Sequence, residues 1–262
     1  MTDIELGALA AEIALEAGEL AARRRREGVH LAATKSTLAD IVTDADREVE
    51  ALIRDRLATE RPDDGFLGEE SGAAGGTSGF TWVVDPIDGT VNYSYGIPAY
   101  SVSIAVVEGT PEPESWNGVA GAVCAPALGE LFTAVRGEGA WHDGARLAVT
   151  TEIPAGALLA TGFGYDPATH DGDLATVRRV MTMARDLRRM GSAAIDLSYV
   201  AAGRLDGFFE RGLNAWDFAA GAILVSEAGG AVSRIELDSR RPLLFAGGRE
   251  VHARLGALLA EN

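Results

Sequence analysis

The sequence contains one cysteine and only four histidines in 262 residues. A lone thiol, Cys124, cannot form an internal disulfide, and it cannot supply the several thiolates of a cysteine-rich zinc site. Imidazole and thiolate are the ligands that softer transition metals select, so the shortage of both disfavours a soft-metal or thiolate site. Any metal site in this chain is therefore predicted to use oxygen ligands.

The chain also lacks a long hydrophobic run and a basic N-terminal segment. No apolar stretch reaches the roughly 18 residues that a membrane-spanning helix needs. Residues 1–5 carry none of the positive charge that opens a secretory signal. The expected location is the cytoplasm.

Positive charge is scarce as well, because 39 acidic residues outnumber 23 basic ones and leave a formal net charge of −16. This balance disfavours general binding to nucleic acid or anionic membranes, which depends on basic contacts. Most of the excess acids serve solubility. An acidic protein that handles a phosphate would nevertheless need bound cations to cover its acids locally.

Apolar residues are plentiful, at 47% of the sequence, which is enough for a sizeable core. Helical periodicity predicts helices at about 4–26, 44–57, 174–184, 192–202, 218–228 and 249–259. Strand patterns predict a β-rich stretch over 100–149 and further strands at 41–42, 66–67, 83–84, 158–161, 206–210 and 243–245. The expected plan is one layered α/β unit over 1–262, with an α+β sub-region at about 1–150 and an α/β sub-region at 151–262.

The central motif is Trp82-Val83-Val84-Asp85-Pro86-Ile87-Asp88-Gly89-Thr90. Its apolar start is typical of the end of a buried strand, and its proline and glycine are typical of a turn. Such a turn would hold Asp85, the Ile87 carbonyl and Asp88 close together as hard oxygen ligands, the kind that Mg²⁺ prefers. Taken alone, the motif is more typical of an ordinary Asp-Pro/Asp-Gly turn.

Further acids recur at predicted strand ends and helix starts, namely Asp40, Asp46, Glu69, Glu70 and Asp217. Ligand sites in open α/β sheets lie at such ends. Each acid alone is better explained as a helix cap, a turn former or a solvated charge. Their shared placement favours a common site.

Four stretches, in this order, carry a family resemblance: Lys35-Ser36-x-x-Asp40-x-Val42-Thr43-x-x-Asp46, Gly68-Glu69-Glu70-Ser71, Asp85-Pro86-Ile87-Asp88-Gly89-Thr90 and Trp216-Asp217-x-x-Ala220. Together they resemble the inositol monophosphatase family of Mg²⁺-dependent, lithium-sensitive phosphatases, over about residues 5–260. The resemblance implies the layered α-β-α-β-α sugar-phosphatase fold and a homodimer. It also implies a phosphoric monoester hydrolase that cleaves inositol monophosphate.

The resemblance assigns the metal ligands to Glu69, Asp85, the Ile87 carbonyl, Asp88 and Asp217, with Asp85 between two ions. It implies that Glu70 holds a metal-bound water and that Thr90, paired with Asp46, orients the attacking water. Lys35 belongs to a segment that resembles the family's mobile loop, where a further metal binds. The backbone amides of Gly89 and Thr90 would hold the phosphate.

Contacts to the rest of the substrate are implied for Asp88, Gly89, Thr90, Gly191, Ser192, Ala193, Glu210 and Asp217. A carboxylate at Glu210 suits a polyol, although an exposed acid at a strand end is also consistent with the sequence. Residues 167–171 lack the arginines that many relatives carry, which disfavours a second phosphate on the substrate. Alternative substrates are histidinol phosphate and sugar phosphates, including fructose 1,6-bisphosphate, and an alternative of another class is a regulatory partner of the transcription machinery.

Overall fold

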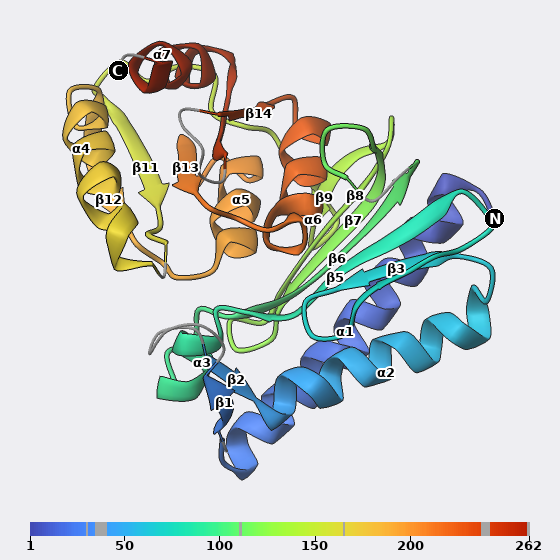
Figure 1. Ribbon diagram of the computed structural model, residues 1–262. Helices are drawn as coiled ribbons and strands as arrows, with labels where there is room; N and C mark the ends of the chain where they lie inside the picture. The colour runs from blue at the N-terminus through green and yellow to red at the C-terminus, as the bar shows by residue number, and fades with distance from the viewer. Residues whose placement is uncertain (30, 35–40, 110–111, 165, 237–241, 261–262) are drawn as a thin grey trace.

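The computed structural model describes residues 1–29, 31–34, 41–109, 112–164, 166–236 and 242–260. Its first two helices, α1 (Asp3–Glu27) and α2 (Asp44–Glu60), pack on each other and on one face of a large sheet (Figure 1). Each helix begins at a capping box formed around a threonine, Thr2 or Thr43. The box satisfies backbone N–H groups that have no partner within the helix, and it thereby fixes both starting points.

The large sheet has eight strands, β3 (Gly65–Gly68), β4 (Gly72–Ala74), β5 (Phe80–Asp88), β6 (Ser101–Glu108), β7 (Asn117–Ala125), β8 (Glu130–Val135), β9 (Gly139–His142) and β10 (Ala145–Arg146). Their order is β10-β9-β8-β7-β6-β5-β3-β4, and every neighbouring pair is antiparallel except β3 with β5. Helices α1 and α2 cover one face, and α6 (Ala215–Glu227) covers the other. Because both faces are covered, the central strands β5 and β6 are buried almost throughout.

The smaller sheet has five strands, β11 (Ala157–Thr161), β12 (Ala184–Arg188), β13 (Gly207–Arg211), β14 (Ala231–Ile235) and β15 (Leu243–Gly247). Their order is β12-β11-β13-β15-β14, with β11 parallel to both of its neighbours. Helices α5 (Ala193–Ala201) and α6 lie between the two sheets, and α4 (His170–Val180) and α7 (Arg249–Ala260) lie on the outer side (Figure 1). The five layers therefore run α-β-α-β-α, which confirms the predicted fold.

The middle helix layer joins the two sheets into one core. Val83 of β5, Phe208 of β13 and Ala219 of α6 belong to a single buried apolar cluster. This position explains why α5 and α6 are rich in small apolar residues on nearly all sides. None of the described helices is both long and apolar enough to cross a membrane.

The structure differs from the sequence prediction at the central motif, because β5 does not end at Val84 but continues to Asp88. Its pairing with β6 joins Asp85 to Ser103 and then Asp88 to Ser101, so three steps on β5 face two steps on β6. The extra residue forms a β-bulge, and a bulge accommodates a proline that an ordinary central strand would not. A short helix, α3 (Thr90–Tyr95), follows.

Two strands of the smaller sheet were not predicted, and both are edge strands. The predicted helix at 174–184 ends at Val180, and the chain then enters β12. Both β12 and β14 are partly or wholly exposed along their length, so neither shows the apolar alternation that marks a half-buried strand. The strands β1 (Leu31–Thr34) and β2 (Ile41–Thr43) form a separate two-stranded sheet, which belongs to neither of the two larger sheets.

Candidate active site

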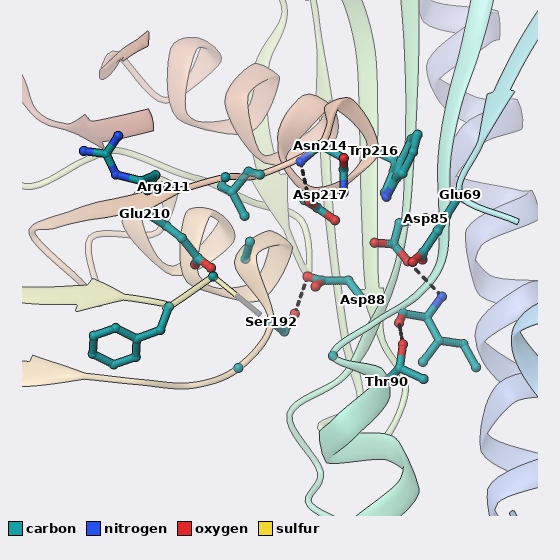
Figure 2. Close-up of a pocket in the computed structure, with 18 of the residues that line it drawn as sticks. Glu69, Asp85, Asp88, Thr90, Ser192, Glu210, Arg211, Asn214, Trp216 and Asp217 are labelled. Atoms are coloured by element: carbon teal, nitrogen blue, oxygen red, sulfur yellow. Dashed lines mark hydrogen bonds between the residues drawn. The ribbon is translucent and has the colours of Figure 1, made fainter. Parts of the chain in front are cut away.

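A cavity of about 680 Å³ lies where the ends of β5 and β13 meet the starts of α5 and α6. Most of the predicted site residues line it, namely Glu69, Asp85, Ile87, Asp88, Gly89, Thr90, Gly191, Ser192, Ala193, Glu210 and Asp217. Figure 2 shows Glu69 beside Asp85, with Asp88 and Asp217 facing them. Residues far apart in the sequence therefore form one concave, acidic site.

The bulged end of β5 presents its oxygen atoms toward this cavity. Asp85 Oδ1 accepts a hydrogen bond from the Ile87 amide at 3.1 Å, and the Ile87 carbonyl accepts one from the Thr90 hydroxyl at 3.0 Å. Gly89 has a φ of +91°, and a Cβ there would lie 2.9 Å from the Ala99 carbonyl oxygen. The turn out of the strand thus requires glycine for its backbone angle and for space.

Asp88 and Asp217 each accept hydrogen bonds at a helix start, Asp88 from a side-chain and a backbone donor and Asp217 from a backbone donor. Asp88 Oδ2 accepts hydrogen bonds from the Ser192 hydroxyl at 2.6 Å and the Ala194 amide at 2.7 Å, at the start of α5. Asp217 Oδ2 accepts one from the Asn214 amide at 2.6 Å, as part of the capping box of α6. The same contacts lie at the helix starts and orient the carboxylates at the cavity, so a capping role and a place in the site are compatible.

Burial and mutual repulsion both act on these acids. Burial raises the pKa of Asp85 well above its usual range, and the charges of Glu69, Asp88 and Asp217 raise it further. Burial also raises the pKa of Asp88 to about 6, against the opposing hydrogen bonds from Ser192 and Ala194. The pKa of Asp217 is raised by burial and then by Asp88 and Glu69. The acids therefore repel one another enough to favour either protonation or a bound cation.

Glu50, which the sequence analysis did not single out, binds the backbone that follows Glu69. The Glu50 carboxylate, buried in α2, accepts hydrogen bonds from the Glu70 amide at 2.9 Å and the Ser71 amide at 2.8 Å. Glu69 lines the cavity, whereas Glu70 is not among its lining residues. This fits the expectation that adjacent residues leaving a strand point in opposite directions.

Asp46 lies behind Thr90 rather than on the cavity wall. Its Oδ2 accepts hydrogen bonds from the Thr43 amide at 2.7 Å and the Thr43 hydroxyl at 2.5 Å, and its Oδ1 accepts one from the Thr90 hydroxyl at 3.3 Å. Burial raises the pKa of Asp46 to about 7. The predicted Thr90–Asp46 pair is therefore present, while Lys35 and Asp40 lie outside the described residues.

The donor set fits a hard divalent cation by its chemistry. Within the described ranges no three acidic, histidine or cysteine side chains are already gathered closely enough to hold a metal. Asp85, Asp88 and Asp217 each turn one oxygen toward a protein donor. Because a carboxylate has about four lone-pair sites, these hydrogen bonds still allow it to bind an ion.

The wall near Glu210 has a different character, since it mixes both signs of charge. Burial raises the pKa of Glu210 to about 8, and the nearby Arg189 opposes that shift. Arg211 Nε lies 3.6 Å from Asp173 Oδ1. Residues 167–171 contain no arginine, but Arg189, in the loop before α5, and Arg211, at the end of β13, both line the cavity. Cationic groups are thus present where the sequence indicated none, although acids accompany them.

Besides Glu50, the sequence analysis missed Asn92, which also connects elements around the site. Asn92 Nδ2 donates to the carbonyls of Ala99 and Met190, each at 2.7 Å, and so ties α3 to the loop before α5. No sequence signal marks Asn92. Glu50 did have a signal, because it lies four residues after Asp46 on the buried face of α2, where an unpaired acid would be costly.

Comparison with known proteins agrees with this geometry. The sequence model of the Inositol monophosphatase family matches residues 4–261. A Mesorhizobium japonicum protein named inositol-1-monophosphatase is 41% identical over 239 residues, covering 90% of this chain and 87% of the relative. The Nus factor SuhB of Escherichia coli K12 is 42% identical over 229 residues, covering 86% and 83%. The crystal structure of extragenic suppressor protein suhB from Bartonella henselae has a TM-score of 0.88 at 37% identity and covers 98% of this chain and 99% of its own.

Proposed function

The chain belongs to the inositol monophosphatase family, and we propose that it hydrolyses inositol monophosphate to inositol and phosphate with the help of Mg²⁺. It is a phosphoric monoester hydrolase, and its family is metal-dependent. One observation carries the proposal. The four carboxylates of Glu69, Asp85, Asp88 and Asp217 come from three separate parts of the chain and line one cavity, together with Ile87, whose carbonyl is the fifth proposed metal ligand.

Our proposal is that Glu69, Asp85, the Ile87 carbonyl, Asp88 and Asp217 would hold the metal. All five donors are oxygen atoms, the type that Mg²⁺ prefers while it keeps positions for water and phosphate. Bound Mg²⁺ would polarise the phosphoryl oxygens, lower the pKa of water and stabilise the leaving alkoxide. The repulsion among these acids supports the assignment, because a cation would relieve it.

Thr90 and Asp46 are proposed to orient the attacking water. The Thr90 hydroxyl lies within hydrogen-bond reach of both the Ile87 carbonyl and Asp46 Oδ1. Asp46, with a pKa of about 7, can exchange a proton near neutral pH. Glu70 is proposed to hold a water through its carboxylate. Lys35 lies outside the described residues, and its proposed place in a metal-binding loop is unchanged from the sequence prediction.

The substrate is proposed to lie between the two walls of the cavity. The amides of Gly89 and Thr90 would hold its phosphate, and the hydroxyls of the inositol would meet Glu210 and the start of α5 at Gly191, Ser192 and Ala193. Asp88 and Asp217 would face both the ion and the substrate. The support is that all of these residues line the same cavity, which is large enough for a small polyol phosphate.

Substrates with a second phosphate remain the weaker alternative. Arg189 and Arg211 could attract one, but Asp173 lies beside Arg211, and Glu210 and Asp166 share the wall. The local charge is therefore not positive, and a neutral polyol fits it better than a second phosphate.

A phosphate-release assay with purified protein tests the proposal. Inositol 1-phosphate, histidinol phosphate, fructose 1,6-bisphosphate and nucleotide monophosphates would be compared with Mg²⁺ and after chelation. We expect the highest kcat/KM for inositol 1-phosphate, and no turnover of any substrate after chelation. A higher kcat/KM for another alcohol would reject inositol monophosphate as the substrate, and turnover without a divalent ion would reject the metal assignment.

Membership of the family also supports proposals about location, oligomeric state and inhibition. We propose a cytoplasmic homodimer, inhibited by lithium, that acts as one unit over its 262 residues. The shared core of the two sheets supports the single unit. A role beside the transcription machinery is the second candidate, because one relative is named a Nus factor. Capture of RNA polymerase by a protein without any turnover would favour that role.

A further inference from the structure

Gly162 lies beside Glu210 in the smaller sheet. Strands β11 and β13 are parallel, with Ala160 opposite Phe208 and Thr161 opposite Phe209. Gly162 follows the last residue of β11, and Glu210 follows Phe209 in β13, at the carboxyl ends where α/β sheets place their ligand sites. Gly162 is buried, and Glu210 is partly exposed on the cavity wall.

The Glu210 carboxylate fills the space that a side chain at position 162 would need. A Cβ built on Gly162 would overlap Cδ, Oε1 and Oε2 of Glu210, far inside van der Waals contact. Gly162 is not among the glycines with a positive φ, so its backbone conformation does not require glycine. Space rather than backbone angle therefore favours glycine here, and the three atoms nearest to the added Cβ all belong to the Glu210 carboxyl group.

We infer that Gly162 is the positioning residue that places the Glu210 carboxylate for contact with substrate hydroxyls, and that it thereby sets the preference for polyol phosphates. This inference rests on the proposed function and adds a residue to it. A methyl group at position 162 would displace the far end of a flexible side chain, which costs the fold little. It would nevertheless move the carboxylate by more than the roughly 0.5 Å that a binding geometry tolerates.

The displacement should matter only for substrates that offer hydroxyls. A site built to bind a hydroxyl discriminates strongly against a ligand that lacks it, because the buried polar group is then left unpaired. A substrate hydroxyl and a carboxyl group left unpaired in a binding site correspond to about a 10- to 100-fold effect on kcat/KM. p-Nitrophenyl phosphate has the phosphate but no hydroxyl, so it reports on the chemistry without Glu210.

The test is a double-mutant cycle of Gly162→Ala and Glu210→Ala. The four proteins would be assayed with inositol 1-phosphate and p-nitrophenyl phosphate in Mg²⁺, and their Tm values measured. Gly75→Ala is the matched control, because a Cβ at Gly75 meets no atom within 4 Å. We expect Gly162→Ala alone to lower kcat/KM for inositol 1-phosphate about 10- to 100-fold and that for p-nitrophenyl phosphate less than about twofold. In the Glu210→Ala background the same change should have no further effect, because the overlapping carboxylate is gone.

Several outcomes would overturn the inference. They are an unchanged rate for Gly162→Ala on inositol 1-phosphate, equal losses on both substrates, or losses that add in the double variant. If Gly162→Ala unfolds but the double variant is as stable as Glu210→Ala, the overlap with Glu210 is confirmed; if both unfold, the inference is wrong. Should the wild type cleave p-nitrophenyl phosphate but no polyol phosphate, the proposed function fails, and the Tm cycle still decides whether Gly162 acts through Glu210.

Discussion

The two walls of the cavity are built in different ways. The charged residues of the wall around Asp85 and Asp88 are all acids, and both aspartates accept a hydrogen bond from a donor close in sequence or at the start of a helix. The wall around Glu210 mixes acids with Arg189 and Arg211, and the Glu210 carboxyl group lies against Gly162, which follows the neighbouring strand β11. The first wall suits a cation and a phosphate, and the second suits an uncharged alcohol.

This difference separates chemistry from specificity. Changes on the acidic wall should abolish turnover of every phosphate ester, because each one would use the same proposed metal ion and water. Changes on the mixed wall should alter the choice of alcohol and leave the cleavage of a simple ester largely intact. Together with the Gly162→Ala variant on the mixed wall, the following experiments on the acidic wall test that division, from the largest expected effect to the smallest.

Asp88→Asn should lower kcat on all substrates by about 10³-fold or more, because several kcal/mol of transition-state stabilisation are lost with a metal ligand. The asparagine carbonyl can still accept the bonds from Ser192 and Ala194, so the fold should survive. Steady-state rates and circular dichroism would be measured. Asp171→Asn, an exposed acid in α4, is the control. A wild-type rate for Asp88→Asn would contradict the proposed mechanism.

Thr90→Val should lower kcat about 100-fold while KM changes little, since general acid–base groups contribute at least this much. Valine has nearly the same shape but cannot bond to the Ile87 carbonyl or to Asp46. Thr90→Ser keeps the hydroxyl and should retain most activity. A larger loss in the serine variant than in the valine variant would show that the methyl group, and not the hydroxyl, is what matters.

The smallest expected effect is the dependence of metal-free stability on pH. The folded-state pKa values of Asp46 and Asp88 are raised, to about 7 and about 6, so between pH 4 and pH 7 the folded protein binds more protons than the unfolded chain. Stability must then fall as pH rises through this window. We expect the Tm of chelated protein to drop by several degrees from pH 5 to pH 7.5. Saturating Mg²⁺ should reduce the drop, and a Tm that rises with pH in the chelated protein would contradict the assignment of buried, repelling acids.

The sequence was most informative about the acidic wall. Asp85, Asp88, Glu69 and Asp217 stand at predicted strand ends and helix starts, where local capping and turn chemistry can be recognised. The layered fold was also predictable, because the central strands and most helices carry clear periodic patterns. The bulge in β5 was not, because it is defined by pairing with β6.

The mixed wall was harder to predict, because it depends on contacts between distant segments. Arg189 enters the cavity only because the edge strand β12 brings the chain there, and β12 has no apolar pattern of its own. The importance of Gly162 is visible only beside Glu210, 48 positions away. Glu50 could have been found from its place on the buried face of α2, but its partners, the amides of Glu70 and Ser71, could not.

The most direct test of the central claim is to locate the metal. Crystals soaked in Mn²⁺, a divalent substitute for Mg²⁺ with measurable anomalous scattering, would be examined by anomalous difference maps. The account predicts peaks within coordination distance of Asp85, Asp88, Glu69 and Asp217. An enzyme that is active with Mn²⁺ but shows no peak in this cavity would contradict it.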